Sequence, residues 1–170
     1  MNIALIGFNG TGKTSVCRLL AQKLGKKVVS TDDAFIKKTN LSASKYVKKH
    51  GIDKFREIES LVIEKMCEMD ECIFDTHCSI VARNENIVNL KRNSFVVMLT
   101  SDLKTISSRI RSSGEIPLSM QNDYLNEVKD IFQNHEQKFM NAADFTIDTS
   151  SMSAEEACDL IAHYVQTELQ

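Results

Sequence analysis

Short apolar segments recur along the chain, and each is bounded by polar or turn-forming residues. Their apolar character is nearly continuous, which is typical of parallel strands that are covered by helices on both faces. The stretches between them are long enough for crossover helices. The pattern therefore predicts an α/β fold, a three-layer α/β/α sandwich around a five-stranded parallel sheet. The predicted strands are 2–6, 27–30, 71–75, 94–99 and 144–148.

A second periodicity, with apolar residues three and four positions apart, predicts helices over 15–25, 54–69 and 154–169. Ser153 and Glu156 stand at the start of the last helix with the spacing of a capping box. Helical and strand patterns thus alternate along the chain, as the α/β prediction requires.

Length and charge limit the classes of protein to consider. The chain has 170 residues, of which 42% are hydrophobic, and this is enough for one domain spanning 1–170 without an internal linker. A net charge of -2 gives no overall attraction to nucleic acid or to an anionic membrane, and no apolar run reaches membrane-spanning length. The N-terminus lacks the features of a secretory signal. We therefore expect a cytoplasmic protein without a nucleic-acid or membrane partner, and we take a monomer as the starting expectation.

The cysteines argue against two structural roles. There are five of them, an odd number, and none forms a CxxC pair. A disulfide framework or a zinc site is therefore not expected, and we interpret the cysteines as reduced residues that lie mostly in the core.

The segment 7–16, GFNGTGKTSV, joins the first predicted strand to the first predicted helix. Its glycines, lysine and threonine fit the phosphate-binding loop G-x-x-x-x-G-K-[ST], although an ordinary glycine-rich turn is the alternative. Small residues let backbone N–H groups turn towards phosphate oxygens, and the helix N-terminus adds positive potential. In such a loop Lys13 reaches the β- and γ-phosphates, and the Thr14 hydroxyl binds Mg²⁺. The predicted nucleotide contacts are Gly7, Asn9, Gly10, Thr11, Gly12, Lys13, Thr14 and Ser15.

The segment VSTDDAFIKKTNLSASKYVKKHGIDKFREIES resembles the acceptor region of the shikimate kinase family, within the nucleoside monophosphate kinase-like group. The spacing from Ile36 to Arg56 is a close match, and the resemblance extends over most of the chain. It implies a P-loop NTPase fold of the small kinase type. It also implies an ATP- and Mg²⁺-dependent phosphotransferase that acts on a hydroxyl group of a small-molecule acceptor. The resemblance places the acceptor-binding region at about 33–65 and a lid at about 110–122.

By position, the resemblance implies that Asp33 contacts the acceptor hydroxyl and that Arg56 binds an anionic group of the acceptor. In-line transfer needs an oriented nucleophile, and a guanidinium pairs with carboxylate or phosphate through two parallel hydrogen bonds. The magnesium-side aspartate of the family falls on Thr31, so Asp32 becomes a candidate metal ligand. As alternatives, the two aspartates cap a helix, and Arg56 pairs with Glu59 on a helix surface.

The chain departs from the family after the third predicted strand, where Thr76, His77 and Cys78 replace a triple glycine. This stretch is instead similar to the D-T-H segment of archaeal-type adenylate kinases. Asp75 would then be a Walker-B-type carboxylate that holds a magnesium-bound water. Thr76 and His77 become candidate substrate contacts. A turn-capping role for Asp75 and a structural role for His77 are the alternatives.

The lid and the second acceptor-binding segment also differ from the family pattern. The resemblance places Arg109 where the family stacks an arginine on adenine, but Ile116 where the lid arginine meets the phosphates. Arg111 is a candidate replacement that reaches inward on closure, unless both arginines belong to a solvated helix face. The second acceptor-binding arginine of the family falls on His135, and Lys138 is a nearby candidate substitute.

Three functions remain open at this point. The leading hypothesis is a kinase that phosphorylates a small hydroxylated, anionic acceptor, with shikimate as the candidate implied by the resemblance. The second is an adenylate or other nucleoside monophosphate kinase. Such an enzyme would need phosphate-binding arginines in 33–65, and Arg56 is the sole arginine there, which argues against this hypothesis. The third is a nucleotide-binding regulatory protein with weak transfer.

Overall fold

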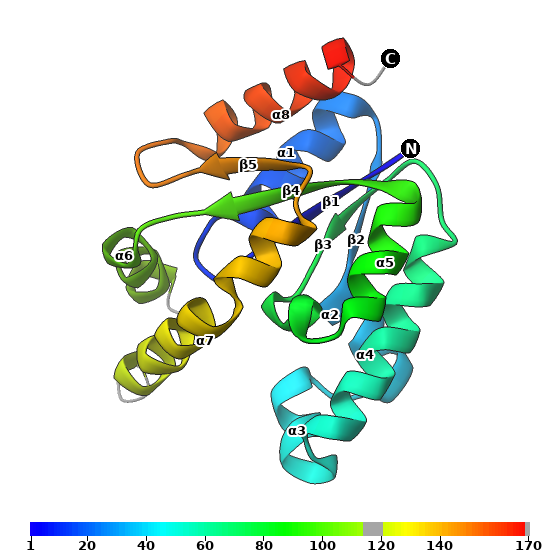
Figure 1. Ribbon diagram of the computed structural model, residues 1–170, viewed down its shortest axis with the longest axis vertical. Helices are drawn as coiled ribbons and strands as arrows, with labels where there is room; N and C mark the ends of the chain where they lie inside the picture. The colour runs from blue at the N-terminus through cyan, green and yellow to red at the C-terminus, as the bar shows by residue number, and fades with distance from the viewer. Residues whose placement is uncertain (114–120, 169–170) are drawn as a thin grey trace.

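The computed structural model describes residues 1–113 and 121–168 and has a central parallel sheet (Figure 1). Its strands are β1 (Asn2–Gly7), β2 (Lys27–Ser30), β3 (Cys72–Asp75), β4 (Ser94–Thr100) and β5 (Phe145–Asp148). Neighbouring strands are parallel, in the order β2-β3-β1-β4-β5. The five predicted strands are confirmed, and each end lies within one residue of its predicted position.

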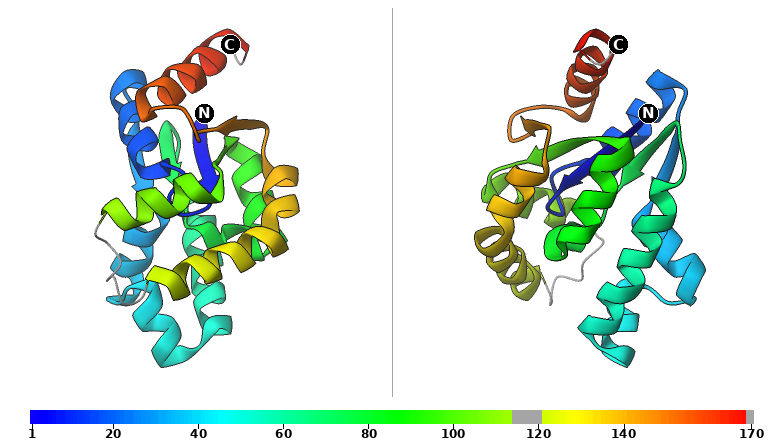
Figure 2. Two further views of the ribbon diagram at one scale, coloured as in Figure 1. Left: turned by 90° about the vertical axis from the view of Figure 1, so that its left-hand side faces the viewer. Right: turned by 45° about the vertical axis from the view of Figure 1, so that its right-hand side comes forward.

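Helices cover both faces of this sheet. They are α1 (Lys13–Leu24), α2 (Thr31–Thr39), α3 (Ala43–His50), α4 (Ile52–Cys67), the 3-10 helix η1 (Cys78–Ala82), α5 (Asn84–Asn93), α6 (Leu103–Ser113), α7 (Gln121–Ala142) and α8 (Ala154–Glu168). Helices α1 and α8 pack on one face, whereas α4, α5, α6, α7 and η1 pack on the other (Figures 1 and 2). This arrangement confirms the predicted three-layer sandwich. The three predicted helices are confirmed as α1, α4 and α8, although α1 and α4 begin two residues earlier than expected.

The core explains the apolar runs of the sequence. Successive side chains of a strand point to opposite faces, and on β1 Ile3 and Leu5 pack towards α1 and α8 while Ala4 and Ile6 pack towards the opposite layer. All four side chains are fully buried. The edge strand β2 differs, because Val28 is 40% exposed. The expectation of coverage on both faces therefore holds for the central strand and is wrong for this edge strand.

The start of α8 and the cysteines match the sequence-based predictions. The Ser153 backbone N–H donates to Glu156 Oε2 at 2.7 Å, and the Glu156 N–H donates to Ser153 Oγ at 3.1 Å, which completes the capping box. The five cysteines are free, and four of them are buried. No helix in the described part of the chain is long and apolar enough to cross a membrane.

The sheet topology fixes where a ligand site can form. Strand β1 lies between β3 and β4, so the order of strands reverses there, and ligands of such sheets bind at the carboxyl ends of the strands beside this point. The connections that follow Gly7, Ser30 and Asp75 leave from that edge. The predicted lid falls largely on 114–120, so Ile116 lies outside the described residues.

Candidate active site

The turn from β1 into α1 has the backbone geometry of a phosphate-binding loop. Gly7 has φ 139°, and a Cβ atom there would lie 2.2 Å from the carbonyl oxygen of Leu99 on the adjacent strand. Gly12 has φ 95° and is the residue from which α1 begins, with open space where a Cβ atom would lie. Both positions have the positive φ that L-residues disfavour. Gly7 is thus required by sheet packing, and it does not itself line the nucleotide cavity described below.

Lys13 lies inside this loop, and only 7% of it is exposed. Its Nζ donates hydrogen bonds to the carbonyl oxygens of Gly7 and Phe8, each at 2.9 Å. Burial lowers the pKa of Lys13, and the nearby Cys78 and Asp75 oppose this effect. The loop backbone therefore holds the ammonium group near the N-terminus of α1. A bound phosphate oxygen there would take the place of some of the water molecules that normally solvate a lysine.

A cavity of about 680 Å³ opens over the loop. It is lined by 9–16, by the last turn of α6 and by the start of α8. Arg109 of α6 lies on its wall, and its guanidinium donates to Thr149 Oγ1 at 3.0 Å, to the Thr149 carbonyl at 2.6 Å and to the Gly10 carbonyl at 3.3 Å. These three bonds fix the plane of the guanidinium, which suits the stacking role expected for Arg109. Arg111 is exposed and lines neither this cavity nor the second one described below.

Thr14 and Asp75 form the site that best fits a divalent cation. The Thr14 hydroxyl donates to Asp75 Oδ2 at 2.7 Å, which brings together the first turn of α1 and the end of β3. Burial raises the pKa of Asp75, whereas the bond from Thr14 and the charge of Lys13 lower it. The described residues contain no group of three or more acidic, histidine or cysteine side chains suited to a metal. One hydroxyl and one carboxylate nevertheless fit Mg²⁺, because this ion usually takes its other ligands from phosphate and water.

The first turn of α2 distinguishes the two neighbouring aspartates. Ser30 is the N-cap, and its Oγ accepts a hydrogen bond from the Asp33 backbone N–H at 3.3 Å, so neither aspartate caps this helix. Asp32 lines the nucleotide cavity and also a second, smaller cavity beside it. Asp33 lines neither cavity. Of the two, the structure brings only Asp32 to the place where a nucleotide and an acceptor would meet.

The second cavity has an apolar wall and a polar rim. Phe35 of α2 and Phe55 of α4 form part of the wall, with ring centroids 5.0 Å apart. Asp32, Glu59 and His77 supply polar groups. With a volume of about 10 Å³ this cavity holds about one water molecule, so its residues form only part of the wall of a site for a hydroxylated ring or carbon chain.

A hydrogen-bonded chain joins Glu59, Ser79 and His77. Ser79 Oγ hydrogen-bonds to Glu59 Oε1 and lies 2.7 Å from His77 Nδ1. Glu59 is 3% exposed, and burial raises its pKa. Burial acts to lower the pKa of His77, but Cys78 and the carboxylates of Asp32 and Glu59 raise it to about 9. The sequence-based hypotheses missed both Ser79 and the inward position of Glu59.

One sequence signal could have revealed Glu59. On α4 it occupies the same stripe as the buried residues Phe55, Val62, Ile63 and Met66, so its position is an apolar one in the helical period. A carboxylate in such a stripe indicates a polar site in the core. The alternative reading of Arg56, a surface ion pair with Glu59, is not found: both residues are described, and no ion pair joins them.

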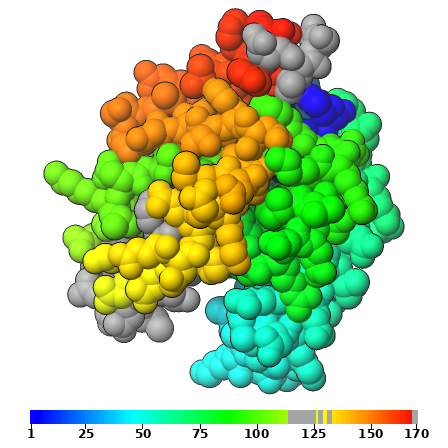
Figure 3. All heavy atoms as spheres, in the orientation of Figure 1, coloured from blue at the N-terminus to red at the C-terminus, as the bar shows by residue number. Residues whose placement is uncertain are grey.

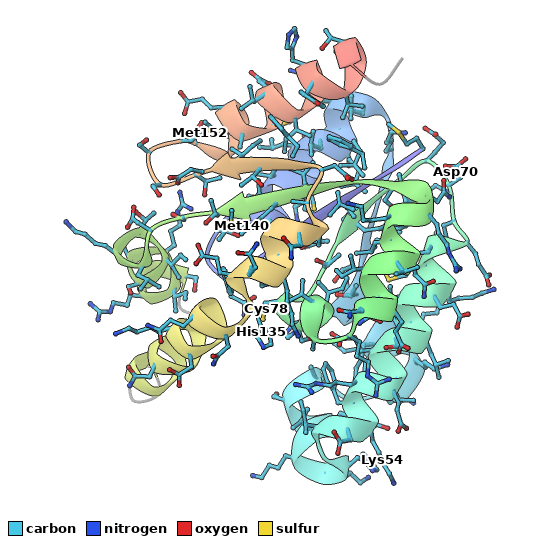
Figure 4. All side chains as sticks on the ribbon, viewed as in Figure 1. Lys54, Asp70, Cys78, His135, Met140 and Met152 are labelled. Carbon is cyan, nitrogen blue, oxygen red and sulfur yellow. The ribbon has the colours of Figure 1, made fainter. Side chains whose placement is uncertain are left out.

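Two nitrogen atoms, Arg56 Nε on α4 and His135 Nδ1 on α7, are buried and have no hydrogen-bond partner within the described residues, and neither residue lines the second cavity. Burial lowers the pKa of His135, and the charges of Lys138 and Arg56 lower it further, which places these groups close together. His135 of α7 and Cys78 of η1 lie near each other in Figure 4, and α7 contacts η1. The surface is hollowed between α7, in yellow, and α3, in cyan (Figure 3).

Thr76 has a structural position. Its hydroxyl donates to the carbonyl oxygen of Leu5 at 2.8 Å, and its side chain is 3% exposed. It lines neither cavity, unlike the neighbouring His77. The structure therefore brings one residue of this predicted substrate-contact pair to the site.

Comparison with known proteins agrees with this geometry. The family model for shikimate kinase matches residues 9–166. The shikimate kinase of Dehalococcoides mccartyi is 36% identical over 160 residues, which cover 94% of this chain and 90% of that protein. The shikimate kinase of Pelotomaculum thermopropionicum is 32% identical over 165 residues, covering 97% and 95%. Among solved structures, shikimate kinase from Acinetobacter baumannii in complex with shikimate has the same fold, with a TM-score of 0.89 and 24% identity over 99% of this chain and 95% of that chain.

Proposed function

Because the chain belongs to the shikimate kinase family, and is an ATP-dependent kinase that acts on a hydroxyl acceptor, we propose that its acceptor is a small anionic alcohol, with shikimate as the first candidate. The observation that carries this proposal is the meeting of two cavities at Asp32 and His77. One cavity has the phosphate-binding loop, and the other has the chemistry for a hydroxylated compound.

On the nucleotide side, Lys13 binds the β- and γ-phosphates, and Arg109 presents its fixed guanidinium to the adenine. Thr14 and Asp75 hold Mg²⁺, directly or through water. When bound, this ion neutralises charge on the phosphate oxygens. Asp32 then remains for the acceptor, where its carboxylate accepts the hydrogen bond of the attacking hydroxyl and orients it.

The charge of the acceptor follows from Arg56 and His135. Two buried, unpaired nitrogen atoms cost free energy unless a ligand accepts their hydrogen bonds. A carboxylate of the acceptor would accept from Arg56, and from His135 once that ring is protonated, with Lys138 adding positive charge. A nucleoside monophosphate would need more phosphate-binding cations in this region, and the family match does not favour that alternative.

The test is an acceptor series measured by ADP release in the presence of ATP and Mg²⁺. We expect strong stimulation by shikimate over the control without acceptor. The methyl ester of shikimate keeps every hydroxyl but loses the negative charge, so it should show a much higher KM. AMP, CMP and other small hydroxy acids complete the series. Stimulation by AMP or CMP alone would overturn the proposal. Equal KM values for shikimate and its ester would show that Arg56 does not bind the acceptor carboxylate.

A further inference from the structure

His77, the last member of the Glu59–Ser79–His77 chain, lies where the family pattern implied by the resemblance has glycine. The sequence places His77 and Cys78 where the family has glycine, so this side chain adds chemistry to the site. His77 lines both the nucleotide cavity and the acceptor cavity. It therefore stands where the transferred group would pass from one to the other, an argument that rests on the proposed function.

Three elements hold His77, one through its backbone and two through its imidazole ring. The His77 backbone N–H donates to Thr31 Oγ1 at 2.8 Å, at the start of α2. The ring lies edge-on to Phe55 of α4, with centroids 6.3 Å apart. The Ser79 backbone N–H points at Nδ1 at 3.2 Å, from the first turn of η1. The ring thus has one orientation before any ligand arrives, and fixed dipoles of this kind need no reorganisation during a reaction.

The hydrogen bonds determine which nitrogen faces the ligands. The Ser79 backbone N–H donates to Nδ1, so a neutral ring accepts at Nδ1 and carries its proton on Nε2. A protonated ring carries a hydrogen on both nitrogens, and Ser79 Oγ, which donates to Glu59, can then accept from Nδ1. Nε2 carries a hydrogen in both states. Nδ1 is used within the chain, which leaves Nε2–H as the donor available to a ligand.

We propose that His77 is a catalytic residue whose Nε2–H donates a hydrogen bond to an oxygen of the phosphoryl group as it is transferred, with Ser79 and Glu59 as positioning residues. The phosphoryl oxygens are acceptors, whereas the attacking hydroxyl must lose its proton to a group such as Asp32. His77 and Asp32 both line the two cavities, so a hydrogen-bond donor and a proton acceptor are present where the cavities meet.

Two substitutions of His77 separate donation from packing. The amide nitrogen of Gln reaches about as far as imidazole Nε2, whereas that of Asn reaches only about as far as Nδ1. We expect His77→Asn to lower kcat roughly 100-fold, the scale for one lost transition-state donor, with little change in the KM for ATP. His77→Gln should stay within about 10-fold of the parent enzyme. A kcat within about 3-fold of the parent for His77→Asn would overturn the proposal.

A binding measurement keeps this test separate from the identity of the acceptor. ADP with Mg²⁺ and aluminium fluoride imitates the phosphoryl group in transfer and needs no acceptor assignment. We expect calorimetry to show that the His77→Asn variant binds ADP, Mg²⁺ and aluminium fluoride with about 10-fold or more lower affinity than the His77→Gln variant. Both variants should bind ADP with Mg²⁺ alone with equal affinity. Equal weakening of both ligands would reveal a structural role and reject the proposal. If shikimate failed as acceptor but the fluoride difference appeared, the acceptor assignment alone would fall.

The role of Ser79 has its own test. Ser79→Ala should lower kcat less than His77→Asn, because the ring keeps its other contacts. In the double variant the two losses should not multiply, since Ser79 acts through His77. Fully multiplicative losses would show that Ser79 does not position the ring.

Discussion

The nucleotide half and the acceptor half of the site are built in different ways. The nucleotide half comes mainly from one continuous segment, 7–16, in which backbone geometry and one lysine do most of the binding. The acceptor half draws side chains from α2, α4 and the turn after β3, with α7 beside it. The backbone of this loop adopts positive φ at Gly7, Gly10 and Gly12, so the nucleotide half tolerates little variation in its motif. The acceptor half depends on side-chain identity, and this is where the chain departs from its family.

The comparison predicts that the nucleotide half fails when Lys13, the cation of its phosphate-binding loop, is removed. Lys13→Met should lower phosphoryl transfer by at least about 1,000-fold, the scale for losing a charge that stabilises the transferring group. The fold should survive, because burial lowers the pKa of Lys13 and its charge has no ion-pair partner within the described residues. Steady-state kinetics and circular dichroism measure the two effects. Retained turnover would remove Lys13 from the mechanism.

Alanine substitutions at Gly7 and Gly12 test whether the loop requires glycine because of close packing or because of positive φ. Gly7→Ala combines a positive φ with a clash against the Leu99 carbonyl, and should reduce the free energy of unfolding by about 3 kcal/mol or more. Gly12→Ala is the matched control, because it has a positive φ without a neighbour within 4 Å, and should cost about 1–2 kcal/mol. Urea unfolding gives both values. Equal losses would show that the packing argument for Gly7 is mistaken.

In the acceptor half, the sharpest comparison is between two adjacent aspartates. Asp32→Asn should lower kcat roughly 100-fold with a small change in ATP affinity, because it removes the group that orients the hydroxyl. Asp33→Asn should have almost no effect, since Asp33 lines neither cavity. Steady-state kinetics on both variants give the comparison. The reverse result would restore the assignment that the sequence resemblance implied.

The magnesium requirement joins the two halves. Asp75→Asn should raise the Mg²⁺ concentration needed for half-maximal activity by about 10-fold, the lower end for losing a ligand-orienting contact. Asp32→Asn should leave this concentration unchanged, because the hydroxyl of Thr14 bonds to Asp75. Magnesium titrations of both variants measure the difference. A shift with Asp32→Asn and none with Asp75→Asn would exchange their roles.

The smallest expected effect concerns stability and pH. Burial raises the pKa of Glu59 in the folded state, so folding favours its protonated form. Its contribution to stability is present below its ordinary pKa near 4.5 and is lost as pH rises through the folded value. Glu59→Gln should therefore gain stability relative to the parent protein between pH 5 and pH 7, as measured by urea unfolding. A constant difference across this range would show that Glu59 does not titrate with folding.

Sequence reasoning succeeded where the relevant information is local. The strands, the start of α8 and the phosphate-binding loop follow from periodicity and short motifs, since each depends on neighbouring residues. Asp75 at a strand end was also identified, and its pairing with Thr14 follows from the adjacency of β1 and β3.

Tertiary structure decided the acceptor half. Successive residues of a helix point about 100° apart, so a one-residue difference in alignment determines whether Asp32 or Asp33 faces the site. The Glu59–Ser79–His77 chain and the approach of Arg56 to His135 join segments that are far apart in sequence. By itself the sequence determined the fold and the phosphate-binding loop, because both arise from local backbone preferences and burial. Only packing between distant elements determined which side chains line the second cavity.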